Sequence, residues 1–275
     1  AFLVFASGET VNLEDERNFS PQQDSDVRLD NKDNTLTIKS GQPASVATEE
    51  YQTLVVPRGG EYKLVLEDGS RVYLNSNTKL HFPLVFAGEK RVVHLEGEAY
   101  FEVVHDAATP FIVKTEEIQI KVLGTTFNLY AYPDDSWFEA SLIEGSIEVT
   151  PYKNPEKQVY LSPNQKARYN HETGEINVMS TDLRVETAWK RGDLIFRNQP
   201  FKEIIGQLEI FYGVNITTDG ECPEELFTGS YHENDIIQVL KNLQQHYTFK
   251  YQKSGNEISL KSVSYTHLRA HETRG

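Results

Sequence analysis

The chain has 275 residues, of which 38% are hydrophobic and 11% aromatic, and its formal net charge is −14. This is enough for one large or two modest domains with a buried core. The acidic balance argues against nucleic-acid binding, which needs a basic stripe, and against docking on an anionic membrane surface. The single cysteine, Cys222, excludes an internal disulfide, and no apolar run reaches the roughly 20 residues of a membrane helix.

Residues 1–186 have the pattern of a mainly β region. Short or alternating apolar runs are separated by turn signals about every 8–12 residues, which is typical of a sandwich, a barrel or a solenoid of stacked short strands. The clearest hairpin joins residues 62–66 to residues 71–74 through Asp68-Gly69, a dipeptide that favours a type I′ turn. A strand over residues 98–104 has apolar groups on both faces, which predicts a central position in its sheet.

Two internal echoes predict stacked β rungs. Residues 3–13 align without a gap with the hairpin at residues 64–74, so we expect a second hairpin at the start of the chain. Residues 95–98 (Leu-Glu-Gly-Glu) resemble residues 143–146 (Ile-Glu-Gly-Ser), and each copy is expected to open a strand. The polar stretch at residues 14–40 is expected to be a long surface loop containing one strand, at residues 35–39.

The apolar period changes from 2 to 3.6 near residue 187. Residues 200–213 predict an amphipathic helix with Pro200 in its first turn and Gly213 just past its end. A second helix is predicted from Asn234, a favourable N-cap, to Tyr247. Short strand patterns flank these helices at residues 194–196, 214–217, 227–231, 249–251 and 258–260. This part therefore reads as a small α+β domain of two strand–helix–strand units.

The expected domain organisation has four segments. They are an N-terminal β motif and polar loop (1–50), an all-β domain (51–186), a C-terminal α+β signalling-type domain (187–262) and a tail (263–275). The tail reads VSYTHLRAHETRG, which looks like a translated sequencing-library adapter, so we exclude it from the functional argument.

The all-β region contains a series of motifs in a fixed order. They are Pro-Arg-Gly-Gly at 57–60, Leu-Glu-Asp-Gly-Ser-Arg-Val-Tyr-Leu-Asn at 66–75, Arg-Val-Val-His-Leu-Glu-Gly-Glu-Ala-Tyr-Phe-Glu-Val at 91–103, Pro-Phe-Ile-Val-Lys-Thr at 110–115, Val-Leu-Gly-Thr-Thr-Phe-Asn at 122–128, Leu-Ile-Glu-Gly-Ser at 142–146 and Leu-Ser-Pro-Asn-Gln at 161–165. Together they resemble the FecR family of anti-sigma factors, in the form common among Bacteroidetes. Residues 192–260 are similar to the companion domain of that family and to the short signalling module at the N-terminus of secretins and TonB-dependent transporters.

The resemblance implies a periplasmic sensor region, tethered to the inner membrane in the full-length protein. In the family, a cytoplasmic segment binds an extracytoplasmic-function sigma factor and a single membrane helix follows. The periplasmic part then senses the signalling domain of a TonB-dependent outer-membrane transporter, and regulated proteolysis frees the sigma factor. The sigma-binding segment and the membrane helix are missing from this sequence, so no residue here is assigned to the sigma factor.

The partner-binding hypothesis concerns exposed sheet edges of the C-terminal domain. A short edge strand accepts a strand from a partner through backbone hydrogen bonds. The candidate residues are Phe227, Thr228, Gly229, Ser230, Tyr231, Ile258, Ser259 and Leu260. The alternative, that both segments are paired internally, stays open.

The residues indicate no enzyme, no cofactor and no metal site. Glu98 and Glu102 share one face of a strand, but positions i and i+4 lie roughly 13 Å apart along a strand, too far for a glycosidase pair. Cys222 has no neighbouring histidine or basic cluster that would activate it as a nucleophile. The metal-ligand candidates considered are His81, His94 and His105 on separate strands, and Asp134 and Asp135, which lack EF-hand spacing.

Two other classes of function remain as alternatives. The first is a carbohydrate-binding or adhesin-like β protein of the cell envelope, which would bind sugars on exposed aromatic rings. Its candidate residues are Tyr73, Tyr100, Tyr130, Tyr132 and Trp137. The second is a hydrolase, which the lack of a convergent acid–base set disfavours.

Overall fold

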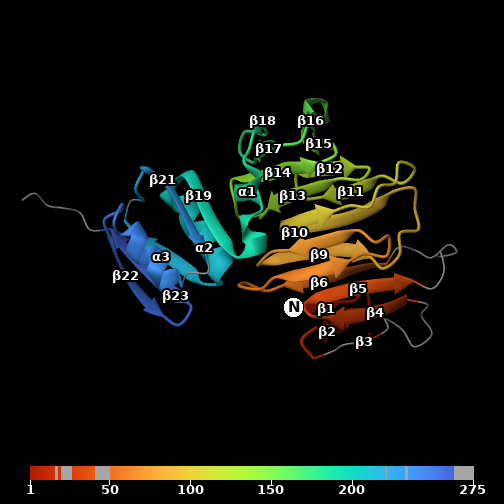
Figure 1. Cartoon of the computed structure of the whole chain (residues 1–275), viewed down its shortest axis with the longest axis horizontal. Coiled ribbons are helices and arrows are strands. Elements are labelled where there is room, and N and C mark those ends of the chain that lie inside the picture. Colours follow the sequence, from red (N-terminus) through yellow and green to blue (C-terminus); the bar gives the residue numbers. More distant parts are fainter. Residues whose placement is uncertain (16–17, 20–26, 41–49, 221, 233–234, 263–275) are drawn as a thin grey trace, which may run out of the picture. The chain divides into compact units, whose positions relative to one another are not determined.

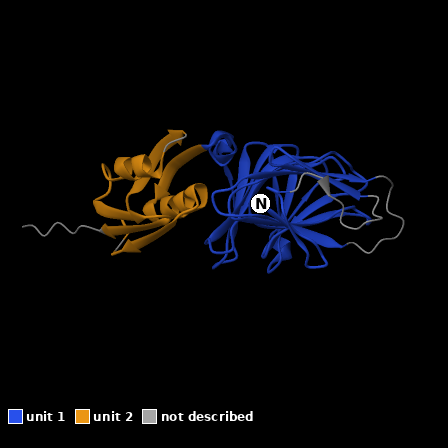
Figure 2. Cartoon of the chain, turned by 90° about the horizontal axis from the view of Figure 1, so that it is seen from below, with its two compact units in different colours: residues 1–192 blue, residues 193–275 orange. Residues whose placement is uncertain are grey.

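In the computed structural model the chain forms two compact units, Ala1–Gly192 and Asp193–Gly275 (Figures 1 and 2). The structure describes residues 1–15, 18–19, 27–40, 50–220, 222–232 and 235–262. The tail that we interpret as an adapter and the expected N-cap Asn234 both lie outside the described residues.

The first unit consists of two β-sheets that share the long strand β10 (Arg91–Glu102). Sheet 1 runs in the order β2 (Thr10–Asn12), β1 (Phe2–Val4), β6 (Tyr51–Val56), β9 (Thr78–Pro83), β10, β11 (Phe111–Lys114), β12 (Ile118–Val122), β15 (Ile147–Pro151), β16 (Val159–Leu161). Sheet 2 runs in the order β3 (Asn18–Phe19), β4 (Val27–Lys32), β5 (Thr35–Ser40), β7 (Tyr62–Val65), β8 (Arg71–Leu74), β10, β13 (Thr126–Ala131), β14 (Trp137–Glu144), β17 (Gln165–Asn170), β18 (Ile176–Ser180).

Successive hairpins of this unit alternate between the two sheets. The hairpin β11–β12 belongs to sheet 1, β13–β14 to sheet 2, β15–β16 to sheet 1 and β17–β18 to sheet 2 (Figure 1). A short 3₁₀ helix, η1 (Pro155–Lys157), joins β15 to β16. The predicted mainly β class with stacked short strands is therefore confirmed.

Strand β10 passes from sheet 1 to sheet 2 at Gly97. Residues before it pair with β9, and residues from Gly97 onward pair with β8 and β13. Gly97 has φ +115°, and a Cβ there would overlap Thr78, so the corner requires glycine. Gly145 repeats this relation with Thr125, between β14 of sheet 2 and β15 of sheet 1. The expectation that each Glu-Gly echo opens a strand is confirmed for residues 143–146, which directly precede β15, and wrong for residues 95–98, which lie within β10. Both copies mark corners between the two sheets.

The inner faces of the two sheets enclose one hydrophobic core. Phe101 of β10 stacks on Phe127 of β13 at 4.8 Å between ring centroids, and it also contacts Phe111 of sheet 1 at 6.3 Å. The predicted alternation along this strand is confirmed, because Ala99 and Phe101 are buried while Tyr100 lies half-exposed on the opposite face. The central position is confirmed too, since β8 and β13 flank this half of the strand.

The turn between β7 and β8 differs from the predicted type I′ turn. Gly69 N–H donates to Leu66 O (2.9 Å) and Leu66 N–H donates to Ser70 O (2.9 Å). Only Gly69 has a positive φ (+83°), whereas a type I′ turn needs two such residues. The connection is therefore a three-residue loop closed by a glycine bulge. In this loop the carboxylate of Asp68 contacts Arg91 and Ser70.

The N-terminal hairpin β1–β2 repeats this turn. Gly8 N–H donates to Phe5 O and Phe5 N–H donates to Glu9 O, both at 2.8 Å. The predicted second hairpin is thus confirmed down to its turn hydrogen bonds. The polar stretch after it differs from the expected loop with one strand, because β4 pairs with β5 along its whole length.

The second unit contains two strand–helix–strand units, as predicted. Its elements are β19 (Asp193–Pro200), α2 (Phe201–Tyr212), β20 (Asn215–Asp219), β21 (Leu226–His232), α3 (Ile236–Leu243), β22 (Phe249–Ser254) and β23 (Glu257–Ser262). Strand β19 pairs with β21, and β23 lies between β20 and β22. Helix α2 ends at Tyr212 and is followed by the capping residue Gly213, which has φ +64°. Asp235 caps helix α3, since its side chain accepts a hydrogen bond from Ile237 N–H.

Candidate functional site

A segment at the end of the first unit crosses the outer face of sheet 2. We call residues 181–192 the strap; it contains helix α1 (Leu183–Glu186), which lies beside β14 (Figure 1), and the 3₁₀ helix η2 (Ala188–Arg191). Beneath it runs a row of directly opposed residues on β8, β10, β13, β14 and β17. The row consists of Tyr73, Tyr100, Asn128, Ser141 and Lys166.

The centre of the strap is held by a hydrogen-bond chain that ends at a buried carboxylate. Trp189 Nε1–H donates to Asn128 Oδ1 (3.2 Å), and Asn128 Nδ2 donates to Glu98 Oε1 (2.8 Å). The other oxygen of Glu98 accepts from Asn75 Nδ2 (2.8 Å). Asn75 Oδ1 in turn accepts from Ser76 N–H (2.7 Å). Because an N–H donor holds each amide oxygen, both amide nitrogens must point at Glu98.

Burial raises the pKa of the Glu98 carboxyl to about 7. The amides of Asn128 and Asn75 act in the opposite direction, because they donate to the charged form and lower this pKa. The carboxylates of Glu186 and Glu139 raise it further through charge repulsion. The anchor of the strap is therefore an acid that can change charge near neutral pH.

Lys166 connects the start of the strap to sheet 2. Its Nζ lies 3.0 Å from Glu186 Oε1 of the strap and 3.1 Å from Glu139 Oε2 of β14. Burial lowers the pKa of this ammonium, but the two carboxylates raise it more, so that the net shift is upward. Lys166 thus remains charged and bridges two acids that would otherwise repel each other.

The end of the strap lies on aromatic rings. Lys190 Nζ is 3.3 Å from the ring centroid of Tyr100 and 4.1 Å from that of Tyr73, within the range of a cation–π contact. The two rings are arranged edge to face at 5.9 Å, and Glu102 Oε1 lies 4.0 Å from the same ammonium. Burial lowers the pKa of Lys190, which the charge of Glu102 partly offsets.

The aromatic residues that were candidates for sugar binding contact other side chains of the same chain. Tyr73 and Tyr100 present their faces to Lys190. Tyr132 is buried and donates to Ser76 O (2.7 Å), while Arg168 lies over the ring of Trp137 at 4.6 Å. Tyr130 donates to Asp135 and packs against Tyr132. Their rings therefore pack against side chains of the chain itself.

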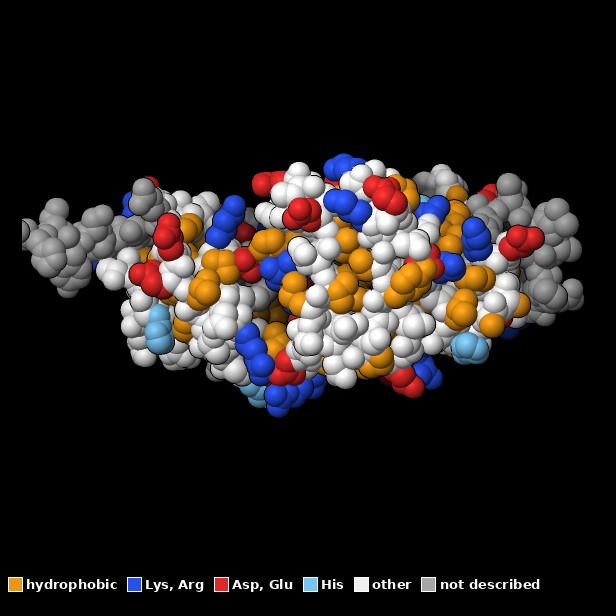
Figure 3. Space-filling model, turned by 90° about the horizontal axis from the view of Figure 1, so that it is seen from above, with side chains coloured by type: hydrophobic (Ala, Val, Ile, Leu, Met, Phe, Trp, Pro, Cys, Tyr) orange, Lys and Arg blue, Asp and Glu red, His pale blue; other side chains and the backbone are white. Residues whose placement is uncertain are grey.

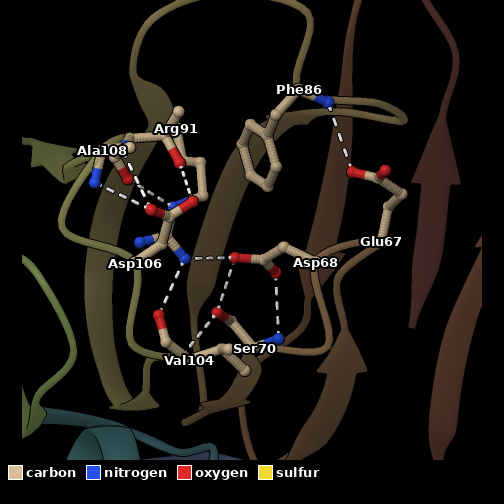
Figure 4. Close-up of polar contacts among 9 residues, drawn as sticks. Glu67, Asp68, Ser70, Phe86, Arg91, Val104, Asp106 and Ala108 are labelled. Atoms are coloured by element: carbon tan, nitrogen blue, oxygen red, sulfur yellow. Dashed lines mark hydrogen bonds and ion pairs between the residues drawn. The ribbon is translucent and has the colours of Figure 1, made fainter. Parts of the chain in front are cut away.

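A second polar cluster explains the Glu-Asp-Gly-Ser motif (Figure 4). Arg91 is buried, and its Nη1 contacts Asp68 Oδ2 at 2.7 Å and donates to Val104 O at 2.9 Å. Asp68 also accepts from Ser70 N–H (2.9 Å) and Ser70 Oγ (2.8 Å). Ser70 Oγ accepts from Val104 N–H (3.0 Å). The cluster ties the β7–β8 turn to both ends of β10, which is a structural role.

The two segments proposed for partner binding have different positions. Phe227 and Tyr231 of β21 point into the core of the second unit, whereas Thr228 and Ser230 are exposed. Among the described strands β21 pairs only with β19. The segment Ile258, Ser259 and Leu260 forms part of β23 and pairs with β20 on one side and β22 on the other. The expectation of a free edge at residues 258–260 was therefore wrong, because this strand is the middle one of its sheet.

The acidic and histidine residues considered for chemistry do not converge. Glu98 is bound to its two asparagines, and Glu102 faces Arg71 at 3.5 Å. His81 and His94 are opposed on β9 and β10, and Thr53 Oγ1 lies 2.7 Å from His81 Nδ1. Within the described ranges, no group of three or more His, Cys, Asp or Glu side chains is placed to hold a metal ion.

The described part of the chain also contains no helix long and apolar enough to cross a membrane. On the face shown in Figure 3, acidic, basic and apolar side chains are interspersed. The net acidic charge is thus not gathered into one patch on that face.

Comparisons with known proteins support the resemblance seen in the sequence. Residues 52–148 match the family described as FecR protein, and residues 193–260 match the family described as FecR, C-terminal. No curated protein matches the sequence significantly.

Two crystal structures of a protein from Parabacteroides distasonis, assigned as an anti-sigma factor, are similar to this chain. The structure at 2.50 Å has 32% sequence identity and a TM-score of 0.73, and the match covers 78% of this chain and 100% of that one. The structure at 1.65 Å has 33% identity and a TM-score of 0.72, with coverage of 77% and 99%. With both family segments in order and this likeness over the whole of a solved relative, the chain belongs to the non-enzymatic FecR family of anti-sigma factors.

Proposed function

We propose that this chain is the periplasmic sensor region of a transmembrane anti-sigma factor. It would receive a signal from a TonB-dependent outer-membrane transporter and relay it to an extracytoplasmic-function sigma factor, which binds a cytoplasmic segment outside this sequence. The observation that carries the proposal is the order of the two matched segments, an all-β FecR part followed by its C-terminal companion. The separate core of the second unit supports a module able to meet a partner.

The edge of β21 is the contact surface we propose for the transporter's signalling domain. Its exposed side chains Thr228 and Ser230 are uncharged. The edge strand β22 instead exposes Lys250 and Lys253, and lysines on an edge disfavour the addition of another strand. A partner strand would gain backbone hydrogen bonds along β21, with Leu226 (61% exposed) as an apolar contact at its start.

Isothermal titration of the whole chain with the isolated signalling domain of the transporter encoded beside it tests this function. Ser230→Lys places a charge on the β21 edge and is expected to weaken binding at least about tenfold. Gln252→Lys adds the same charge to the exposed face of β22 and is expected to leave the Kd unchanged.

The possible outcomes separate the two levels of the proposal. Absence of binding by the parent chain would refute contact with this transporter. Binding that both lysine variants weaken equally, or that neither weakens, would refute the β21 edge while keeping the receptor contact.

A further inference from the structure

The strap has buried apolar side chains that belong to neither hydrophobic core. Ala188 and Trp189 are buried, Trp189 to 7% exposure, but the core of the first unit and that of the second are both built without them. Trp189 lies on the outer face of sheet 2, above Asn128. Lifting the strap would therefore expose one indole and a polar row while leaving both cores closed.

The anchors of the strap are polar and lie on three different strands of sheet 2. Glu186 pairs with Lys166 on β17, Trp189 donates to Asn128 on β13, and Lys190 lies over Tyr100 on β10. Water can replace each such contact, so the net contribution of each one is small. Such a segment opens locally with a lower free energy than the strands beneath it.

The strap also holds the connection between the two units. It ends at Gly192, whose φ of +70° turns the chain and whose surroundings would leave space for a Cβ. Strand β19 of the second unit begins at the next residue, Asp193. We propose that the strap is a latch: while Trp189 and Lys190 are docked it fixes the start of the connection, and when it opens it releases that connection with both units still folded.

Glu98 is the positioning residue of this latch. Its carboxylate accepts from Asn128, which turns the amide oxygen of Asn128 toward Trp189. Three further groups on neighbouring elements interact electrostatically with Glu98: Glu186 in α1, Glu139 on β14 and Tyr130 on β13. The side chain of Tyr132, which follows β13, also faces this charge.

Hydrogen exchange measured by mass spectrometry on the whole chain tests the latch. In the parent, the amides of residues 187–192 are expected to exchange at least about tenfold faster than those of β13 and β14, because they open locally. Trp189→Ala is expected to speed exchange of residues 187–192 by a further factor of about ten and to leave both units protected. Trp137→Ala is the matched control, because it removes the other tryptophan of the chain, on β14 of the same sheet.

A second readout is cleavage by trypsin after Lys190 and Arg191. Release of the strap makes these bonds accessible, so Trp189→Ala is expected to be cut there faster than either the parent or the Trp137→Ala control. If Trp189→Ala fails to fold, Trp189→Phe keeps one aromatic ring and removes the N–H donor to Asn128 together with the second ring of the indole. It is expected to speed both readouts to a smaller degree.

Two results would overturn the proposal. One is unchanged exchange and cleavage at residues 187–192 in the tryptophan variants, which would show that Trp189 does not hold the strap. The other is loss of protection in the strap and the sheets together, in the parent or in Trp189→Phe, which would show that the strap unfolds only with the first unit.

Discussion

Replacing Glu98 by glutamine removes a buried titratable group while keeping its shape, and the consequence can be calculated. The folded protein keeps a proton on Glu98 up to its pKa of about 7, whereas the unfolded chain releases it near pH 4.5. Stability therefore falls as the pH rises through this window, because the ionised group is costly to bury. For these two pKa values the proton contributes about 2 kcal/mol to the free energy of unfolding at pH 5.5 and almost nothing at pH 8.

Glutamine stays neutral throughout, so Glu98→Gln lacks this contribution. The parent is expected to lose about 2 kcal/mol more than the variant between pH 5.5 and pH 8. The other ionisable groups are present in both proteins, so their contributions largely cancel in the difference. Any constant effect of the new amide on Asn75 or Asn128 also cancels, because only the slope with pH is compared.

Urea unfolding followed by tryptophan fluorescence measures this difference. Trp137, on β14, lies in the same sheet as Glu98, so its part of the signal reports the unfolding of the first unit. Trp189 responds in addition to release of the strap. The lower limit of pH 5.5 keeps the protein above its sequence pI of about 5.0. Parallel pH profiles for the two proteins would refute the reasoning, since they would show that the two amide donors outweigh burial and hold Glu98 ionised over the whole range.

Three further substitutions test the packing within the two units. Asp68→Ala leaves the guanidinium of Arg91 buried without its carboxylate and is expected to lower the free energy of unfolding by about 3–5 kcal/mol. The control Asp30→Ala removes an exposed ion pair with Lys39 and is expected to cost less than about 1 kcal/mol. Urea unfolding measures both losses. Gly97→Ala places a side chain at φ +115° against a neighbouring strand and is expected to cost at least about 2 kcal/mol in the same assay, and a smaller loss would mean that the sheet corner relaxes. Gly206 lies inside α2, where a Cβ would meet open space, so Gly206→Ala is expected to raise the stability of the second unit by about 1 kcal/mol. The circular dichroism transition of this unit measures the change, and destabilisation would contradict the open surroundings.

The sequence predicts the fold well where a local pattern decides the structure. The period-2 runs and Asp-Gly turn locate the β7–β8 hairpin, and Gly213 marks the end of α2 because a left-handed residue is needed there. The Glu-Gly echo was found in the sequence, but its role as a sheet corner was missed, because the corner at Gly97 depends on contact with Thr78 of another strand. The turn type was missed for a related reason, because the side chain of Asp68 forms an ion pair with Arg91, a residue distant in the sequence.

The strap could not be predicted in the same way. Its 12 residues show no regular spacing of apolar side chains. Its contacts join residues that are distant in the sequence, Trp189 to Asn128 and Lys190 to Tyr100. One signal was available: Trp189, one of only two tryptophans, stands where the apolar period changes, and a large aromatic residue at a domain boundary indicates a buried contact. The edge assignment of residues 258–260 failed because strand order within a sheet follows from tertiary pairing.

The strand motif Glu98-Ala99-Tyr100-Phe101 carries two roles on its two faces. Ala99 and Phe101 point inward and build the core, which accounts for a scaffold role. Glu98 and Tyr100 point outward, and both act on the strap, one through Asn128 and the other through Lys190. The strap itself lies in the interval between the two matched family segments, at residues 52–148 and 193–260. The FecR part therefore builds its own core and also holds the segment that leads to its companion. A change at Tyr100, whose ring contacts Lys190 of the strap, is expected to act on the connection between the units before it acts on the fold.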